Sequence, residues 1–202
     1  DDRAQSWLSA RERQRHDAFV FAHSKREFLA TRTLCRGVLA EICSLPPSQL
    51  QFSESAYGRP ALVPNAPFDF NLTNTEALVA CVIGAGPVGV DAEPLPRLES
   101  IHEVAHMVFT DAERERLKRA PELGLDLWVL KASYMKAVGY GMSLPPSTFE
   151  MRQGDDGHWS VAHVAPPAAL ALPPDGQLQF HLLTLAEHRV AICALDLTQL
   201  QI

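Results

Sequence analysis

The 202-residue sequence lacks long apolar runs and paired cysteines. No stretch reaches the roughly 18 consecutive apolar residues that a membrane helix needs, and no signal-peptide pattern opens the chain. The four cysteines lie singly in apolar stretches without a C-x-x-C motif, which is typical of reduced core residues in a cytoplasmic protein. The sequence therefore predicts neither a membrane-spanning helix nor a disulfide framework.

An excess of positive charge is also missing. The chain has 18 basic and 24 acidic side chains, and a formal net charge of −6 argues against a surface for duplex nucleic acid. A composition of 47% hydrophobic and 21% charged residues excludes a disordered chain. The length suits one large domain or two small ones. Asp1-Asp2-Arg3 runs directly into a helical pattern, so a missing or removed N-terminal strand is one expectation.

Hydrophobic periodicity predicts an alternation of helices and strands. A 3.6-residue period predicts a strong helix over residues 25–43, which ends at Leu45-Pro46-Pro47. Weaker helical patterns cover residues 4–22, 99–108, 111–119 and 126–138. Strands are expected at residues 50–52, 68–71, 77–83, 88–93, 148–152, 159–164, 178–185 and 189–195. Together these elements predict an α+β protein.

Two parts of the sequence echo each other. Phe70-Asn71-Leu72 followed by the apolar residues 79–83 is similar to Phe180-His181-Leu182 followed by residues 190–194. Each half also reads as a helix followed by antiparallel strands. The pattern indicates two similar α+β lobes, residues 1–90 and 91–202, although unrelated strand pairs can look equally alike.

A glycine-rich segment, Gly84 to Gly89, matches the dinucleotide-binding pattern G-x-G-x-x-G. That pattern works only where a helix begins, because the N-terminal amides of the helix must face the pyrophosphate. Here Val88-Gly89-Val90 predicts a strand instead, and prolines follow it. We therefore expect a hairpin turn at this position and no nucleotide site.

A second motif, His102-Glu103-x-x-His106, matches the zinc-hydrolase pattern H-E-x-x-H. On one continuous helix the two imidazoles would share a face, and the glutamate could activate a zinc-bound water. The third ligand is missing from its usual place, and the nearby glutamates lie in a highly charged segment. A solvated helix face is the favoured interpretation, and zinc hydrolysis remains the less favoured function.

Paired carboxylates follow an apolar strand. Asp91 and Glu93 stand two apart on a predicted strand, so both point to one face and suit Mg²⁺ shared with a phosphorylated ligand. On the predicted helix over 126–138, Trp128, Ala132 and Lys136 follow at four-residue spacing, so Lys136 can meet a phosphate. The alternatives are a solvated loop edge and an exposed lysine beside a core tryptophan.

The carboxylate pair and the helix with Lys136 are two of several segments that occur in the same order in a known family. The chain resembles the 4′-phosphopantetheinyl transferases of the surfactin-synthetase type from about Arg11 to its last strand. The segments that carry the resemblance are, in order, Tyr57-Gly58-Arg59-Pro60, Phe70-Asn71-Leu72-Thr73-Asn74, Gly89-Val90-Asp91-Ala92-Glu93, Phe109-Thr110-Asp111-Ala112-Glu113 and Trp128 to Gly141.

The resemblance implies an α+β pseudodimer of two similar lobes in one chain. It implies transfer of the phosphopantetheine arm of coenzyme A to a serine of an acyl or peptidyl carrier protein, with release of 3′,5′-ADP. Asp91 and Glu93 would bind Mg²⁺, and Lys136 would stabilise charge on the pyrophosphate. A cytoplasmic, monomeric enzyme that uses neither nucleic acid nor a membrane is expected.

The resemblance also implies residues that bind coenzyme A. Arg15 stands where a basic residue contacts the nucleotide phosphate, and Gly58-Arg59-Pro60 stands near the adenine and 3′-phosphate. Thr73 and Asn74 replace the family's Ser-His pair. The phosphate-binding histidine is thus an uncharged asparagine, which can still donate a hydrogen bond.

A further departure concerns the helix motif, which is normally Trp-x-x-Lys-Glu. Ala132 stands where the family has its glutamate, the third metal-side carboxylate and general base. Alanine can serve neither purpose. The chain is therefore expected to be either a weakened or inactivated transferase, or a homologue that binds coenzyme A and carrier protein without efficient turnover.

Overall fold

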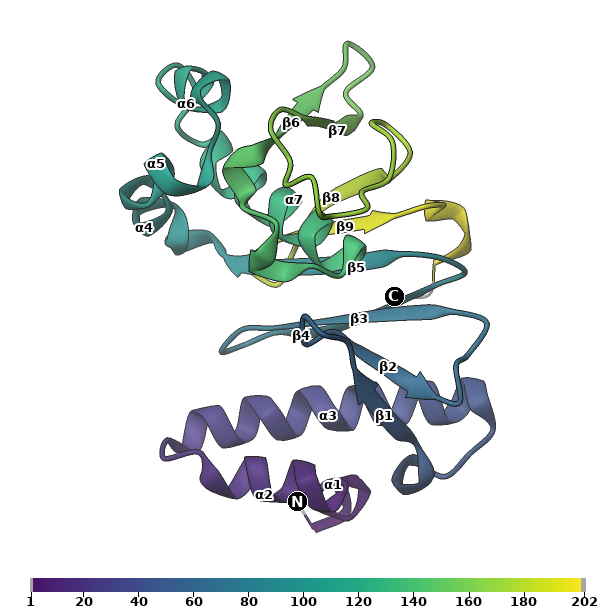
Figure 1. The fold of residues 1–202 in the computed structure, drawn as a ribbon. Helices are drawn as coiled ribbons and strands as arrows, with labels where there is room; N and C mark the ends of the chain where they lie inside the picture. The colour runs from purple at the N-terminus through teal and green to yellow at the C-terminus, as the bar shows by residue number, and fades with distance from the viewer. Residues whose placement is uncertain (1, 201–202) are drawn as a thin grey trace.

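A long helix in each half packs on a sheet, and the two sheets face each other between these helices (Figure 1). The computed structural model describes residues 2–200. In the N-terminal lobe the elements are α1 (Asp2–Trp7), α2 (Ala10–Ala18), α3 (Ala22–Cys43), β1 (Gln51–Glu54), β2 (Pro60–Val63), β3 (Asp69–Asn74) and β4 (Val79–Gly84). None of the described helices has the length and apolar composition that crossing a membrane requires.

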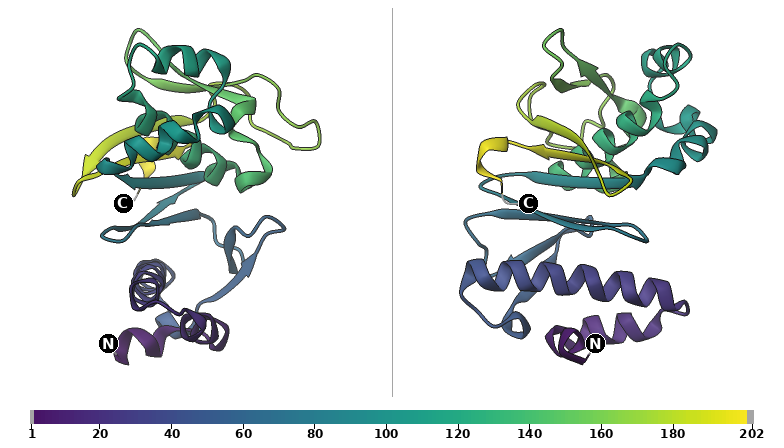
Figure 2. Two further views of the ribbon diagram at one scale, coloured as in Figure 1. Left: turned by 90° about the vertical axis from the view of Figure 1, so that its left-hand side faces the viewer. Right: turned by 180° about the vertical axis from the view of Figure 1, so that it is seen from behind.

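The C-terminal lobe repeats this plan with extra short helices. Its elements are β5 (Val88–Pro94), α4 (Leu98–Glu103), α5 (Ala105–Val108), α6 (Asp111–Leu117), α7 (Leu123–Val138), β6 (Phe149–Gln153), β7 (Trp159–His163), β8 (Gln179–Leu185) and β9 (His188–Ala194). Seen from the side and from behind, α3 and the C-terminal lobe lie on opposite sides of β3 and β4 (Figure 2), and α7 is buried inside the C-terminal lobe. The predicted α+β class is confirmed.

The strand pairing divides the molecule between β4 and β5. Antiparallel pairs join β1 to β2, β3 to β4 and β6 to β7, while β5, β9 and β8 form a three-stranded sheet in that order. The expected hairpin turn after Gly84 is therefore wrong, because β4 and β5 belong to different sheets and residues 85–87 cross between them. Residues 88–90, expected in the first lobe, pair within the sheet of the second.

Two predicted helices are interrupted. The pattern over residues 4–22 breaks before α2, where Ser9 Oγ accepts the N–H of Glu12 and Glu12 Oε2 accepts the N–H of Ser9. This reciprocal capping box starts a new helix. The pattern over 99–108 breaks at Val104, where α4 ends and α5 begins. Apolar periodicity continues across both breaks, so it could not reveal them.

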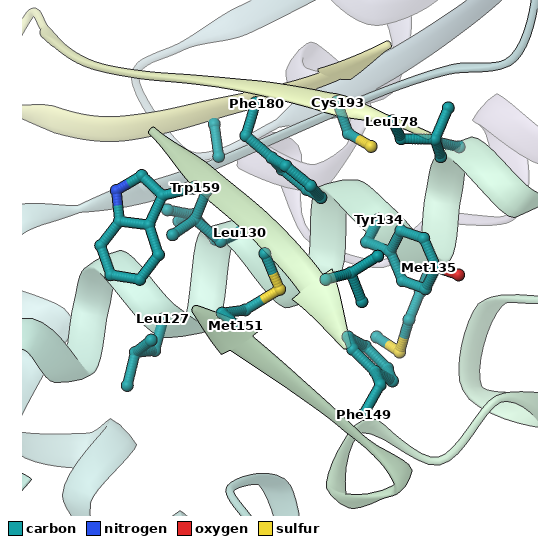
Figure 3. Close-up of a cluster of buried hydrophobic side chains, with 14 of the residues drawn as sticks. Leu127, Leu130, Tyr134, Met135, Phe149, Met151, Trp159, Leu178, Phe180 and Cys193 are labelled. Carbon is teal, nitrogen blue, oxygen red and sulfur yellow. The ribbon is translucent and has the colours of Figure 1, made fainter. Parts of the chain in front are cut away.

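The larger hydrophobic core lies in the C-terminal lobe between α7 and the sheets (Figure 3). One side of α7 places Leu127, Leu130 and Tyr134 against side chains from β6 to β9. The labelled side chains opposite them in Figure 3 are Phe149, Met151, Trp159, Phe180 and Cys193. Fully buried apolar side chains of this size contribute about 1.5–3 kcal/mol each, so this cluster fixes α7 on its sheet.

A buried ion pair recurs in both lobes. In the first, Arg36 on α3 donates to Glu12 of the α2 capping box at 2.6 Å. In the second, Lys131 on α7 lies 2.8 Å from Glu113, whose carboxylate completes the capping box of α6. Each cation also donates to two backbone carbonyls before or at the start of the next strand. Equivalent contacts at equivalent places support the expected duplication.

The lobes meet along β3 and β5 through side chains bonded to backbone. Asn71 Oδ1 accepts the N–H of Val90 at 3.1 Å, and Thr73 Oγ1 accepts the N–H of Ala92 at 3.3 Å. These bonds satisfy N–H groups on the free edge of β5, which would otherwise be buried without partners. The lobe junction is thereby a polar seam that runs beside Asp91.

Candidate active site

Strand β5 brings its two carboxylates directly under α7. Gly89, Asp91 and Glu93 share one face of the strand, and that face meets the helix. At Gly89 a β-carbon would lie 2.1 Å from the backbone oxygen of Ser133, so only glycine permits this approach. The close contact sets the distance from which α7 side chains reach Asp91 and Glu93.

Lys136 pairs with Asp91 at the lobe junction. Its Nζ lies 2.8 Å from Asp91 Oδ1 and 2.8 Å from the carbonyl oxygen of Val90. The other carboxylate oxygen, Oδ2, is buried and has no hydrogen-bond partner within the described residues. Burial raises the pKa of Asp91, although Lys136 opposes that rise. An unpartnered buried oxygen on a carboxylate is what a missing cation would leave.

Glu93 accepts hydrogen bonds from two side chains, one on α7 and one at the end of the 3₁₀ turn that follows β5. Trp128 Nε1 donates to Glu93 Oε1 at 3.1 Å, and Arg97 Nη1 donates to Glu93 Oε2 at 2.8 Å. Burial raises the pKa of Glu93, and the neighbouring charge of Asp91 raises it further, while Arg97 and Trp128 act in the opposite direction. The two neighbouring carboxylates concentrate negative charge that a cation between them would neutralise.

Ala132 lies on α7 between Trp128 and Lys136, one turn from each. The sequence thus places it beside the carboxylates, as expected, but it supplies no oxygen. Among residues 2–200 no group of three or more His, Cys, Asp or Glu side chains is placed to hold a metal. Asp91 and Glu93 provide two hard oxygen ligands, which fit Mg²⁺ when phosphate oxygens and waters complete its shell.

Arg15 lies apart from this seam. It stands on α2 and lines a cavity of about 620 Å³ in the N-terminal lobe, together with Arg11, Arg32 and Pro60. The Arg15 guanidinium lies 5.7 Å from the ring centroid of Phe28. Arg36, Glu12 and Glu54 also line this cavity, and the two glutamates pair with Arg11, Arg32 and Arg36. The expected contact of Arg15 with a nucleotide phosphate remains a prediction.

Arg59 is engaged within the protein. Its guanidinium pairs with Asp69 at 2.5 Å, donates to the carbonyl of Val88 at 2.8 Å and also contacts the carbonyl oxygen of Lys136. These contacts join the lobes across the seam. Nη1 and Nη2 of Arg59 thus already have acceptors within the protein, and the expected role of Gly58-Arg59-Pro60 near the adenine and 3′-phosphate remains a prediction.

Thr73 and Asn74 differ in their placement although they are neighbours. Thr73 is buried and uses its hydroxyl oxygen to accept the N–H of Ala92, and its expected role toward coenzyme A remains a prediction. Asn74 is exposed at the end of β3. Next to it, Thr75 Oγ1 lies 2.8 Å from His188 Nε2, which joins the two lobes again.

The H-E-x-x-H motif does not form a metal site. The helix breaks at Val104, between the two histidines, so they do not share one helical face. His102 Nε2 lies 2.9 Å from the carbonyl oxygen of Pro121 instead. The zinc-hydrolase alternative is wrong for this arrangement of the described chain.

Comparison with known proteins gives the class of protein. The sequence model of the 4′-phosphopantetheinyl transferase superfamily matches residues 87–193, and that of the N-terminal domain of 4′-phosphopantetheinyl transferases matches residues 2–85. The chain belongs to the 4′-phosphopantetheinyl transferase superfamily.

Two named relatives from Bacillus subtilis agree with this membership. A 4′-phosphopantetheinyl transferase of Bacillus subtilis is 27% identical over 96% of this chain and 85% of its own length. The transferase named ffp, also from Bacillus subtilis, is 30% identical over 79% of this chain and 73% of its own length. A solved holo-[acyl-carrier-protein] synthase from Helicobacter pylori, in complex with coenzyme A, aligns with 54% of this chain and 99% of its own at 12% identity and a TM-score of 0.44.

Sequence reasoning missed Arg97, Asn71 and the pair of Glu113 with Lys131. Arg97 follows Glu93 by four residues, and this spacing could have indicated an ion pair. Four-residue spacing brings side chains together in an α-helix, however, and residues 95–97 form a 3₁₀ turn instead. The pair of Glu113 with Lys131 had a signal in the S/T-x-x-E capping pattern that starts at Thr110. Nothing in the sequence marks Asn71 as a partner of β5, because that contact exists only between lobes.

Proposed function

We propose that this chain transfers the 4′-phosphopantetheine arm of coenzyme A to a serine of an acyl or peptidyl carrier protein. The observation that carries the proposal is the convergence of Asp91, Glu93 and Lys136 at the lobe junction of a member of this superfamily. Two neighbouring carboxylates beside one lysine suit a ligand that carries a pyrophosphate and a divalent ion.

Asp91 and Glu93 would hold Mg²⁺, which would neutralise negative charge on the pyrophosphate when bound. The unpartnered Oδ2 of Asp91 supports this assignment. Lys136 is one-third exposed in its side chain, so it can exchange part of its contact with Asp91 for a phosphate oxygen. There it would stabilise the charge that gathers on the leaving 3′,5′-ADP.

The reaction is a phosphoryl transfer. The serine oxygen of the carrier forms a bond to the phosphorus that bears the pantetheine arm, and the bond from that phosphorus to the bridging oxygen of 3′,5′-ADP breaks. The serine proton must leave as this happens. With Ala132 on the helix face toward the carboxylates, water is the acceptor we propose for that proton, which lowers the rate relative to a carboxylate base.

The contacts across the seam support a single chain as the working unit, because both lobes contribute to one site. We propose that the enzyme acts as a cytoplasmic monomer whose partners are coenzyme A and a carrier protein. The alternative is a homologue that binds both without transferring the arm, and Ala132 is the feature that favours it.

Labelling of an apo carrier protein with a fluorescent coenzyme A in the presence of Mg²⁺ tests the proposal. Intact-mass spectrometry should show the added arm on the carrier serine, and an Asp91→Ala variant should lose most of the transfer. Calorimetry on the same preparation separates the alternatives. Coenzyme A binding without any transfer would identify a non-catalytic homologue, and no binding of coenzyme A would reject the proposed function.

A further inference from the structure

Arg97 occupies a carboxylate oxygen that a divalent cation would need. It stands after β5, at the end of a short 3₁₀ turn, and its Nη1 lies 2.8 Å from Glu93 Oε2. The side chain of Glu93 is 11% exposed, whereas that of Arg97 is 46% exposed. The guanidinium lies 5.6 Å from the ring centroid of Trp128, so it also rests against the indole that binds the other oxygen of Glu93.

The negative charges of the two carboxylates are thus compensated by basic side chains of the same protein. Lys136 occupies Oδ1 of Asp91 and Arg97 occupies Oε2 of Glu93, so two negative and two positive side chains meet at the site. Of the four oxygens of these two carboxylates, only Oδ2 of Asp91 is left without a hydrogen bond among the described residues. A cation that binds Oδ2 of Asp91 and one oxygen of Glu93 must therefore compete with Arg97 or with Trp128, and of these two only Arg97 carries a positive charge.

Arg97 is the basic side chain that a cation can displace. Lys136 is anchored by Asp91 and by the carbonyl of Val90 at 2.8 Å each, and its side chain is less exposed than that of Arg97. Arg97 is nearly half exposed, so water can solvate its guanidinium when the contact to Glu93 is broken. The flat ring of Trp128 offers a cation–π surface along which the guanidinium can turn without losing all of its contacts.

We propose that Arg97 is a displaceable counter-ion for Glu93. It holds the carboxylate in the free protein and, once a divalent cation binds Glu93, its guanidinium turns to phosphate oxygens of the coenzyme A bound beside it. This inference rests on the proposed function for its second half. The planar fork of arginine suits two phosphate oxygens at once, which a flexible lysine matches less well.

An Arg97→Ala variant tests both halves of the proposal, because one half predicts tighter binding of a metal ion and the other predicts weaker binding of coenzyme A. Without coenzyme A, removal of the competing charge should tighten Mn²⁺ binding about threefold, as measured by paramagnetic resonance of the free ion. With saturating Mg²⁺, coenzyme A affinity measured by calorimetry should fall about tenfold, because a charge-assisted contact to phosphate is lost. An Arg119→Ala variant removes the same charge from an exposed position after α6 and should change neither constant by more than about twofold.

The combinations of results are distinct. Weaker binding of both ligands by a folded Arg97→Ala protein would mean a structural role and would overturn the proposal. Unchanged or tighter binding of coenzyme A by the Arg97→Ala protein would overturn the proposed contact between the Arg97 guanidinium and phosphate oxygens. Arg97→Lys should return Mn²⁺ affinity to within about twofold of the parent and coenzyme A affinity only in part. If the parent chain bound no coenzyme A, the proposed function would fail, while the Mn²⁺ measurement would still decide the counter-ion role.

Discussion

Lys131 and Glu113 form an ion pair that is closed off from solvent, with Nζ 2.8 Å from Oε2 and side-chain exposures of 1% and 0%. The pair joins α7 to the start of α6 and lies on the opposite side of α7 from Lys136. It therefore holds the helix that carries the candidate site without taking part in the site. Arg36 and Glu12 occupy the corresponding place in the other lobe.

Breaking this pair should destabilise the protein strongly. Lys131→Met leaves Glu113 buried without its cation, and loss of one partner of a buried pair typically costs about 3–5 kcal/mol. Urea denaturation should show this loss, whereas Lys118→Met, which removes an exposed partner of Glu115, should cost less than about 1 kcal/mol. A loss below about 1 kcal/mol in Lys131→Met would show that the pair does not anchor α7.

Neutralising Asp91 should stabilise the free protein. Burial raises the pKa of Asp91 above its ordinary value of 3.8. The folded state then binds the proton more tightly than the unfolded state. The associated stability is present at pH values below 3.8 and is lost as pH rises through the folded pKa.

At pH 7 and without metal, Asp91→Asn should therefore melt about 2–4 °C higher, the shift that ~1 kcal/mol produces in a domain of this size. The gain should shrink as the pH is lowered toward 4. Asp155→Asn, which changes the same charge in an exposed turn, serves as the control. A lower melting temperature for Asp91→Asn would mean that the bond to Lys136 outweighs the burial of the charge. Scanning calorimetry at several pH values distinguishes these outcomes.

Restoring a carboxylate at position 132 should raise turnover. A glutamate there would lie one turn from both Trp128 and Lys136 and would point toward Asp91 and Glu93. General-base assistance is typically worth about 10²–10⁴-fold, so Ala132→Glu should speed transfer at least about 10²-fold with a much smaller change in coenzyme A affinity. Initial rates of carrier labelling measure it. Ala132→Gln has the same shape without the charge, and an equal gain in that variant would refute a base at this position.

Thiol reactivity should be confined to one cysteine. Burial raises the pKa of Cys35 to about 12 and that of Cys81 to about 11, and it also raises the pKa of Cys193. Their thiolates are therefore scarce at neutral pH, and only Cys43 is half-buried. An aromatic disulfide reagent at pH 7.5 should modify Cys43 rapidly and the other three only after denaturation. Cys43→Ser should remove the fast phase, and a fast phase that persists would show that a buried thiol opens.

The sequence by itself determined which segments form the main helices and strands, and which side chains of the candidate site share a face of one element. The 3.6-residue period located α3 and α7, and two-residue spacing placed Asp91 and Glu93 on one face of a strand. Four-residue spacing placed Trp128 and Lys136 on one face of a helix. These relations are local, because helix and strand geometry alone fixes which nearby residues share a face.

Tertiary structure decided which of these side chains are free to act. Arg59 and Thr73 lie where the sequence predicts ligand contacts, yet their polar atoms are used to join the lobes. Glu93 was expected to face a metal, and only the fold shows that Arg97 reaches its second oxygen. Such contacts depend on the packing of α7 against β5 and of β3 beside β5. A hydrogen bond between residues far apart in the chain has no signature in local spacing, because its geometry exists only after the lobes have come together.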